Sequence, residues 1–213
     1  MVIRPRGRFI TLEGGEGVGK STQIAALAVE LRTRGLNVIE TREPGGSTGA
    51  EAIRELLLHA AADAWDPVTE ALLFAAARGD HVQRVIRPAL DRGDWVLCDR
   101  FVDSSRAYQG GRRGLDDGTI MTLHGIGSGG LLPDRTLLFQ LDEAQSVRRR
   151  SERSLGRNDR FEDRDTRFHA AVADRFQAMA QAEPERFRSI DAGGQPAVVT
   201  AAALAAIADL LPE

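Results

Sequence analysis

The residues best suited to chemistry form a glycine-rich run that ends in a lysine and a serine. Residues 14–21 read Gly-Gly-Glu-Gly-Val-Gly-Lys-Ser, which fits the pattern G-x-x-x-x-G-K-[ST], and they follow an apolar run at 8–12. Glycines let successive backbone N–H groups face one anion, and the lysine adds a point charge for the β- and γ-phosphates of a nucleotide. The expected phosphate-binding residues are Gly14, Gly15, Glu16, Gly17, Val18, Gly19, Lys20, Ser21 and Thr22.

The same run predicts a helix start and a metal ligand. After Thr22, apolar residues recur at three- and four-residue spacing through Leu31, so a helix N-terminus would direct its positive dipole end at the anion. The hydroxyl of Ser21 can ligate Mg²⁺. A chance glycine-rich turn between a strand and a helix is the alternative interpretation.

A second candidate is Asp99, which ends the apolar segment 95–98. An apolar strand that ends in Asp has the form of a Walker B element, whose carboxylate holds Mg²⁺ at the carboxyl edge of a parallel sheet. Asp99 is therefore the expected partner of Ser21 at the metal, and Arg100 would point into the same crevice. Taken alone, the motif also fits an ordinary exposed pair of residues at a strand end.

Further segments carry residue types that bind a phosphate and a flat base. Arg42 is expected at a strand end before a tight turn, where its guanidinium can grip a phosphate from the side opposite the glycine-rich run. Phe74 and Arg78 lie four residues apart on one helical face, and 103–111 adds hydroxyl and amide side chains. An aromatic ring beside a guanidinium and an amide suits base recognition. The alternative is a core position for Phe74 and a solvated Arg78.

Strand-like and helix-like segments alternate along the chain and predict the fold that positions these residues. Strands are expected at 9–12, 38–41, 95–98, 136–141 and 187–190. Helices are expected at about 20–34, 49–59, 67–78, 81–91, 116–125, 143–153, 165–183 and 197–211. This alternation predicts one α/β domain over residues 1–213, with a mainly parallel sheet of five strands and helices on both faces.

Composition narrows the classes of function. The 213 residues include 28 Lys and Arg against 31 Asp and Glu, a net charge of −3, so nothing attracts the whole chain to nucleic acid or to an anionic membrane. No apolar stretch reaches the roughly 18 residues of a membrane span, and the N-terminal residues lack the apolar segment of a signal peptide. The single cysteine, Cys98, fits a small core residue in a reducing compartment. The four histidines lack metal-ligand spacing, and we expect a cytoplasmic protein.

Several of these segments occur together, in this order, in bacterial thymidylate kinases, which the chain resembles over nearly its whole length. The shared segments are 14–21, Thr41-Arg42-Glu43-Pro44-Gly45-Gly46, Phe74 to Arg78, Asp99-Arg100-Phe101, Ala107-Tyr108-Gln109-Gly110-Gly111 and Asp159-Arg160-Phe161-Glu162. The resemblance implies a three-layer α/β/α P-loop kinase fold with a mobile lid at about 148–162. It also implies a homodimer that transfers the γ-phosphoryl group of ATP to dTMP with Mg²⁺, giving ADP and dTDP.

The resemblance assigns roles to the matching positions. The implied substrate site comprises Glu16, Arg42, Glu43, Arg54, Phe74, Arg78, Arg100, Ser105, Tyr108 and Gln109. Within it, Phe74 would stack on thymine, Glu16 would sense the sugar 3′-hydroxyl and Tyr108 would disfavour a ribose. Arg42 and Arg100 would bind the dTMP phosphate. The implied metal site comprises Ser21, Asp99 and Glu162. Phe101 departs from the family, which often has Tyr or His at this position, so a polar group is absent there.

The basic segment 148–160 has three interpretations. A charge run is usually a solvated face, and basic clusters can also bind nucleic acid. However, phosphoryl transfer develops negative charge, and the glycine-rich run offers Lys20 but no arginine. Family members with glycine at the position of Gly17 supply arginines from a closing lid. Arg153 and Arg157 thus join Lys20 and Arg100 as expected catalytic residues, with Arg149 and Arg160 behind them.

Two other functions stay open at this point. A switch ATPase would share the glycine-rich run and Asp99, but it should lack the set Arg42, Phe74, Arg78 and Gln109. A kinase for another nucleoside or nucleotide is the closer alternative. The apolar faces of the helices at 67–91 and 116–125 could form the implied dimer interface, although they could equally be core.

Overall fold

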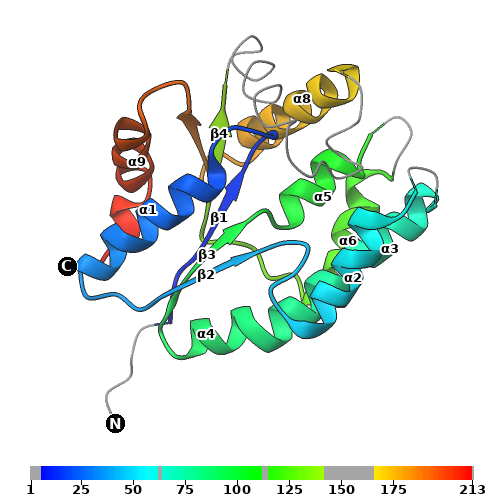
Figure 1. Ribbon diagram of the computed structural model, residues 1–213, viewed down its shortest axis with the longest axis horizontal. Coiled ribbons are helices and arrows are strands. Elements are labelled where there is room, and N and C mark those ends of the chain that lie inside the picture. The colour runs from blue at the N-terminus through cyan, green and yellow to red at the C-terminus, as the bar shows by residue number, and fades with distance from the viewer. Residues whose placement is uncertain (1–5, 62–63, 112–114, 142–165, 213) are drawn as a thin grey trace.

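The computed structural model describes residues 6–61, 64–111, 115–141 and 166–212. Five parallel strands form one sheet in the order β2-β3-β1-β4-β5 (Figure 1). The strands are β1 (Phe9–Glu13), β2 (Val38–Arg42), β3 (Trp95–Asp99), β4 (Arg135–Gln140) and β5 (Phe187–Asp191). Because all five strands run in the same direction, their carboxyl ends lie at one edge of the sheet.

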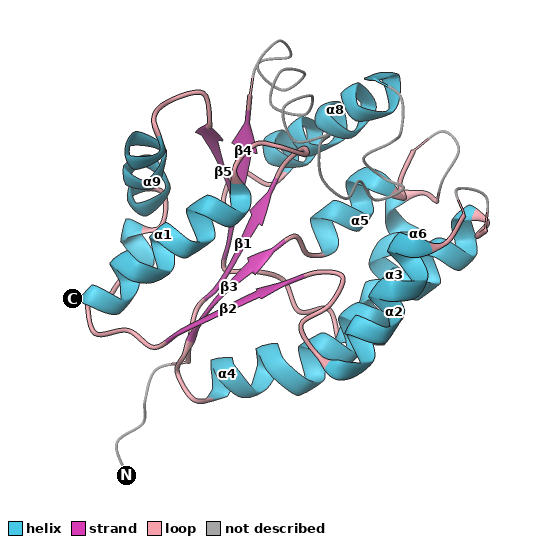
Figure 2. Ribbon diagram, viewed as in Figure 1, coloured by secondary structure: helices cyan, strands magenta, loops and turns pink. Residues whose placement is uncertain are grey.

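Helices cover both faces of this sheet (Figure 2). They are α1 (Lys20–Thr33), α2 (Thr48–His59), α3 (Pro67–His81), the π-helical η1 (Val82–Ile86), α4 (Arg87–Asp91), α5 (Val102–Tyr108), α6 (Asp117–Ser128), α8 (Thr166–Ala182), α9 (Pro196–Ala205) and the 3₁₀ turn η2 (Ala208–Leu210). Helices α1 and α9 lie on one face, and α2 to α6 lie on the other together with α8 (Figure 1). None of the helices described is both long and apolar enough to cross a bilayer.

The hydrophobic core lies on both faces of the sheet, between the strands and the helices that cover them. All five residues of β1 are buried, which is typical of a central parallel strand. Side chains alternate along it, so Ile10 and Leu12 pack with α1 and α9, whereas Phe9 packs with η1 and α4. Cys98 is fully buried in this second cluster, as expected, and burial raises the pKa of its thiol.

The predicted α/β fold is confirmed, and each predicted strand agrees with the structure to within one residue at each end. The predicted helix break at 79–80 is wrong, because α3 runs on through Gly79 into η1. Gly79 instead allows a close approach of α6, since a Cβ there would lie 2.8 Å from the carbonyl oxygen of Gly127. Helix α5 was missed because seven residues are too few for a clear helical period.

Two further expectations concern the C-terminal half. The predicted helix at 197–211 is shorter, since α9 ends at Ala205 and only η2 follows it. The predicted helix at 143–153 and the lid at about 148–162 lie outside the described residues.

Candidate functional site

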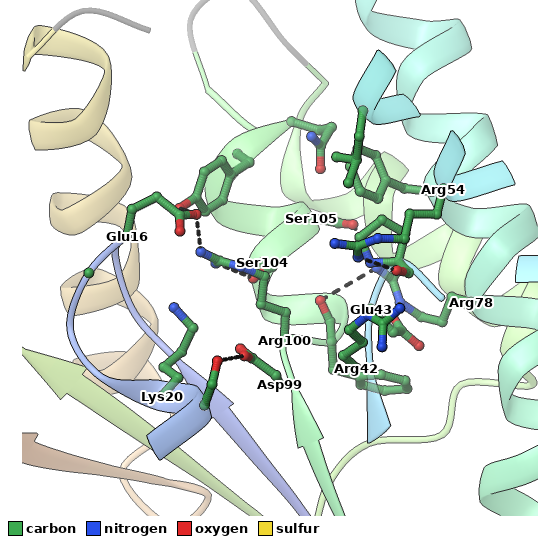
Figure 3. Close-up of a pocket in the computed structure, with 18 of the residues that line it drawn as sticks. Glu16, Lys20, Arg42, Glu43, Arg54, Arg78, Asp99, Arg100, Ser104 and Ser105 are labelled. Atoms are coloured by element: carbon green, nitrogen blue, oxygen red, sulfur yellow. Dashed lines mark hydrogen bonds and ion pairs between the residues drawn. The ribbon is translucent and has the colours of Figure 1, made fainter. Parts of the chain in front are cut away.

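A cavity of about 220 Å³ opens at the carboxyl edge of the sheet (Figure 3). Its wall combines the loop after β1, the end of β2 with the loop after it, helices α2 and α3, and the end of β3 with α5. Strand β1 is central, with β3 on one side and β4 on the other. Ligands of open α/β sheets bind outside the carboxyl ends of the strands, at such a switch point in strand order.

The loop after β1 has the geometry of an anion cradle. Gly14 and Gly19 have φ values of 132° and 94°, conformations that other residues rarely adopt. A Cβ at Gly14 would also collide with the backbone oxygen of Phe139. The Nζ of Lys20 donates to the carbonyl oxygens of Gly14 (3.2 Å) and Gly15 (2.9 Å), so the ammonium lies over the loop. Burial, and after it the charge of Arg100, lower the pKa of Lys20.

Arg100 links this loop to the far wall of the cavity. Its guanidinium forms an ion pair with Glu16 and donates to Ser104 Oγ at 3.0 Å (Figure 3). It also donates to the carbonyl oxygen of Gly14 at 3.2 Å. The guanidinium carbon lies 5.0 Å from the ring centroid of Tyr108. Burial alone would raise the pKa of Glu16, but the charges of Arg100 and Lys20 outweigh it and hold that pKa at about 2. Glu16 is therefore ionised at neutral pH and can accept a hydrogen bond from a ligand hydroxyl.

Two oxygen-bearing side chains of the cavity wall, those of Ser21 and Asp99, contact each other. Ser21 Oγ donates to Asp99 Oδ2 at 3.2 Å. The other carboxylate oxygen, Asp99 Oδ1, is buried and has no hydrogen-bond partner among the described residues. A hard cation such as Mg²⁺ prefers oxygen ligands and is often held by one or two protein groups together with phosphate and water. Ser21 and Asp99 fit such a cation, and no group of three metal-ligating side chains occurs in the described part of the chain.

The opposite wall contains a buried arginine. Arg78 Nε donates to Glu43 Oε2 (2.8 Å), and Arg78 Nη2 donates to Ser105 Oγ (2.7 Å). Its side chain is only 3% exposed, so the alternative of a solvated Arg78 is wrong. Glu43 Oε1 also bonds His81 Nδ1 (3.0 Å), and His81 Nε2 bonds Thr41 Oγ1 (2.7 Å). This network fixes a guanidinium beside the cavity.

Three more predicted substrate residues line the same cavity as Arg78. Arg42 Nη2 donates to both carboxylate oxygens of Glu51, at 3.0 and 3.1 Å, on the solvent side. Such exposed pairs are worth only about 0–1 kcal/mol, so a phosphate can replace the Glu51 carboxylate as its partner. Arg54 Nη1 donates to the carbonyl oxygen of Pro44 (2.6 Å), and Gln109 Nε2 donates to Glu70 Oε1 (3.0 Å).

The structure brings most of the predicted site residues to one cavity. Those that line it are Glu16, Gly17, Gly19, Lys20, Ser21, Arg42, Glu43, Arg54, Phe74, Arg78, Asp99, Arg100, Ser105, Tyr108 and Gln109. Gly14, Gly15 and Val18 instead border a second cavity beside β4 and α8, and Thr22 is exposed on α1. Arg149, Arg153, Arg157, Arg160 and Glu162 lie outside the described residues.

Sequence analysis missed two buried carboxylates next to the cavity. Glu13 ends β1, and its oxygens accept from the backbone N of Phe101 (2.7 Å) and from Ser104 Oγ (2.7 Å). Burial, and after it the charge of Asp103, raise the pKa of Glu13 to about 8. The available signal was an acidic residue at the last position of an apolar strand, the same signal that singled out Asp99.

The second missed carboxylate, Asp103, anchors α5. Arg186 Nη1 donates to Asp103 Oδ2 (2.6 Å) and Nη2 donates to Oδ1 (2.9 Å), while Arg106 Nη1 donates to Oδ1 (3.1 Å). Burial opposes ionisation of Asp103, but these guanidinium groups outweigh it and lower its pKa. No local pattern could reveal the pair, because Arg186 is 83 residues away in the sequence.

Comparisons with known proteins find relatives of one family over almost the whole chain. The family model "Thymidylate kinase" matches residues 12–202. A thymidylate kinase of Rhizorhabdus wittichii is 63% identical over 206 residues, covering 97% of this chain and 99% of that protein. A thymidylate kinase of Caulobacter vibrioides is 50% identical over 197 residues, covering 92% and 94%. The crystal structure of thymidylate kinase from Ehrlichia chaffeensis superposes with a TM-score of 0.76 at 32% identity, covering 96% and 99%.

Proposed function

This chain belongs to the thymidylate kinase family, and we propose that it transfers the γ-phosphoryl group of ATP to dTMP within the cavity described above. One observation carries the proposal: a single cavity joins a phosphate-binding loop to a wall made by Arg42, Phe74 and Arg78. The first part suits a nucleoside triphosphate and the second suits a nucleoside monophosphate. A switch ATPase would have no use for the second part.

The reaction needs positioning and charge rather than a protein nucleophile. An oxygen of the dTMP phosphate attacks the γ-phosphorus in line, the new P–O bond forms, and the bond to the β-phosphate oxygen breaks to leave ADP. Lys20 and Arg100 line the same cavity. Lys20 neutralises charge on the transferring γ-phosphoryl group, and Arg100 neutralises charge on the phosphate of dTMP. Holding both nucleotides in one site makes the transfer effectively unimolecular.

Magnesium binding belongs to this proposal. Ser21 and Asp99 would hold the ion, and the buried, unpartnered Oδ1 of Asp99 supports that assignment. Bound Mg²⁺ would neutralise charge on the β- and γ-phosphate oxygens. Glu162 as a further ligand stays a prediction, as do Arg153 and Arg157 as lid arginines.

The base would lie between Phe74 and Arg78. Arg78 keeps donors near the cavity because Glu43 and Ser105 engage the rest of its guanidinium. Arginine donors suit the O4 acceptor of thymine better than the amino group at the same position of cytosine. Glu16, ionised beside Arg100, is the proposed acceptor for the sugar hydroxyl.

A homodimer is a further part of the proposal. Apolar side chains are exposed on α2, α3 and α6: Leu56, Val68, Leu72 and Ile126 are 51%, 49%, 48% and 79% exposed. Helices α2 and α3 pack on each other, as do α3 and α6, and a contiguous exposed apolar patch over such neighbouring helices would mark an interface. Sedimentation of the purified protein tests the dimer, and a monomer at micromolar concentration would contradict it. The cytoplasmic location stays a prediction.

The substrate assignment is tested by one assay. A coupled ADP-release assay should compare dTMP, dUMP, thymidine, CMP and AMP at equal concentrations with ATP and Mg²⁺. We expect the largest kcat/KM with dTMP. A larger value for another acceptor would contradict the proposed substrate, and ADP release without any acceptor would favour the switch ATPase.

A further inference from the structure

Glu13 is buried beside the cavity but does not line it. It is the last residue of β1, directly before the phosphate loop. Both of its carboxylate oxygens are used, Oε1 by the backbone N of Phe101 and Oε2 by Ser104 Oγ, each at 2.7 Å. The two donors belong to the segment that follows β3 and carries Arg100.

The backbone of Arg100 needs outside support. Its φ of 68° lies in the left-handed region, which residues with a side chain adopt rarely and only where their surroundings hold them. The N–H of Arg100 donates to the carbonyl oxygen of Leu12 (3.0 Å), and the next N–H, that of Phe101, donates to Glu13. The end of β1 therefore holds the backbone on both sides of Arg100.

The guanidinium of Arg100 depends on the same carboxylate through Ser104. Arg100 Nη1 donates to Ser104 Oγ (3.0 Å), and Ser104 Oγ donates to Glu13 Oε2. Glu13 thus reaches both the backbone and the charged end of Arg100 (Figure 3 shows the link from Arg100 to Ser104). The same guanidinium also contacts Glu16 and Gly14 of the phosphate loop.

We propose that Glu13 is a positioning residue that holds Arg100 against the phosphate loop in the orientation needed to meet the phosphate of dTMP. This inference rests on the proposed function. Burial and the nearby charge of Asp103 make a carboxylate costly at this position, which is typical of functional sites. A displacement of a catalytic group by about 1 Å can reduce the rate by about 10²-fold, so a residue that touches no substrate can still control the reaction.

The test replaces the carboxylate by the amide of the same shape. Assayed above pH 8, where Glu13 is ionised, Glu13→Gln should lower kcat/KM for dTMP by about 10- to 100-fold, with the KM for ATP changed less than about 2-fold. If Glu13 acts through Arg100, the same substitution should have almost no effect in an Arg100→Ala background. This loss of additivity is a result that a merely structural role would not produce.

Asp134 provides a matched control at the opposite end of β1. Its carboxylate also accepts from a backbone N–H, that of Phe9 (2.8 Å), and from a side chain, that of Arg8 (3.3 Å). Asp134→Asn makes the same chemical change far from the cavity. It should lower the melting temperature without changing kcat or the KM for either nucleotide.

The outcomes separate the inference from the proposed function. Wild-type protein that fails to phosphorylate dTMP would overturn the proposed function itself. An active wild type with normal kinetics in Glu13→Gln, or with an equal loss in both backgrounds, would overturn only the inference. If Glu13→Gln does not fold, Ser104→Ala removes the link to the guanidinium alone. It should lower kcat/KM for dTMP by about 3- to 10-fold, and only when Arg100 is present; an unchanged value would overturn the inference.

Discussion

The two ends of the cavity are built in opposite ways. At the end proposed for ATP, the cradle is one continuous run of backbone after β1, and Lys20 Nζ donates to two carbonyl oxygens of that run. At the end proposed for the thymine base, called the base end, Arg78 is held by Glu43 and Ser105, which are 35 and 27 residues away in the sequence. One end is therefore local backbone, and the other is a buried network of side chains.

This difference predicts different responses to mutation. Removing a side chain from the backbone cradle should remove charge needed in the reaction and leave the fold nearly intact. Removing one member of a buried ion pair leaves its partner charged and unpaired in the interior, which costs about 3–5 kcal/mol. The base end should thus lose stability and substrate binding together.

The largest expected effect is that of Lys20→Ala. It should lower kcat by about 10³-fold or more, because a charge on the transferring phosphoryl group is lost. The melting temperature should change by only a few degrees. Turnover at saturating ATP together with a thermal melt checks both parts, and near-normal turnover would contradict the assignment of the loop.

The next effect is that of Glu43→Gln at the base end. We expect the free energy of unfolding to fall by about 3–5 kcal/mol and the KM for dTMP to rise at least about 10-fold, since Arg78 loses its buried partner. Glu40→Gln is the matched control, because Glu40 pairs with Arg32 near the surface and should contribute about 0–1 kcal/mol. Equal losses in urea denaturation of the two variants would remove the contrast between the two ends.

Asp99→Asn tests the proposed Mg²⁺ site, which lies at the ATP end of the cavity. One carboxylate oxygen is retained in the amide, so the protein should fold, but the charge that attracts Mg²⁺ is lost. The Mg²⁺ concentration for half-maximal activity should rise about 10- to 100-fold. Activity measured across a Mg²⁺ titration checks this, and an unchanged midpoint would argue for other ligands.

Phe74→Ala should produce a smaller and more selective loss. The ring is partly exposed, so we expect the lower part of the roughly 1–3 kcal/mol range for base stacking, a rise of about 5- to 30-fold in the KM for dTMP. ATP affinity should stay the same. Separate titrations with the two nucleotides check the prediction, and equal losses for both would indicate misfolding.

The last prediction concerns stability rather than catalysis, and it follows from the pKa of Glu13. Its pKa in the folded protein, about 8, is above its ordinary value of 4.5, so the folded state binds more protons between these values and stability falls as pH rises through them. Glu13→Gln has no such titration. The melting temperature of the wild type relative to this variant should therefore be highest near pH 5 and lowest near pH 8. The opposite trend would mean that the pKa of Glu13 is lowered.

Much of the fold could be predicted because it depends on local patterns. The five strands follow from short apolar runs, and the phosphate loop from glycines whose φ values no other residue adopts easily. The helix break predicted at 79–80 shows the limit of such patterns. A glycine that would end an isolated helix is retained inside α3 because Gly127 of α6 approaches it closely.

The sequence by itself determined the alternation of strands and helices, the phosphate-loop motif and the residue types of the proposed base pocket, because backbone geometry and side-chain chemistry are properties of short segments. Only the tertiary structure decided the strand order, the pairing of Arg78 with Glu43, and the hydrogen bond between Glu13 and the backbone next to Arg100. The physical reason is burial. The energy of a charge depends on which distant groups exclude water from it and which of them bond to it, and folding alone brings those groups together.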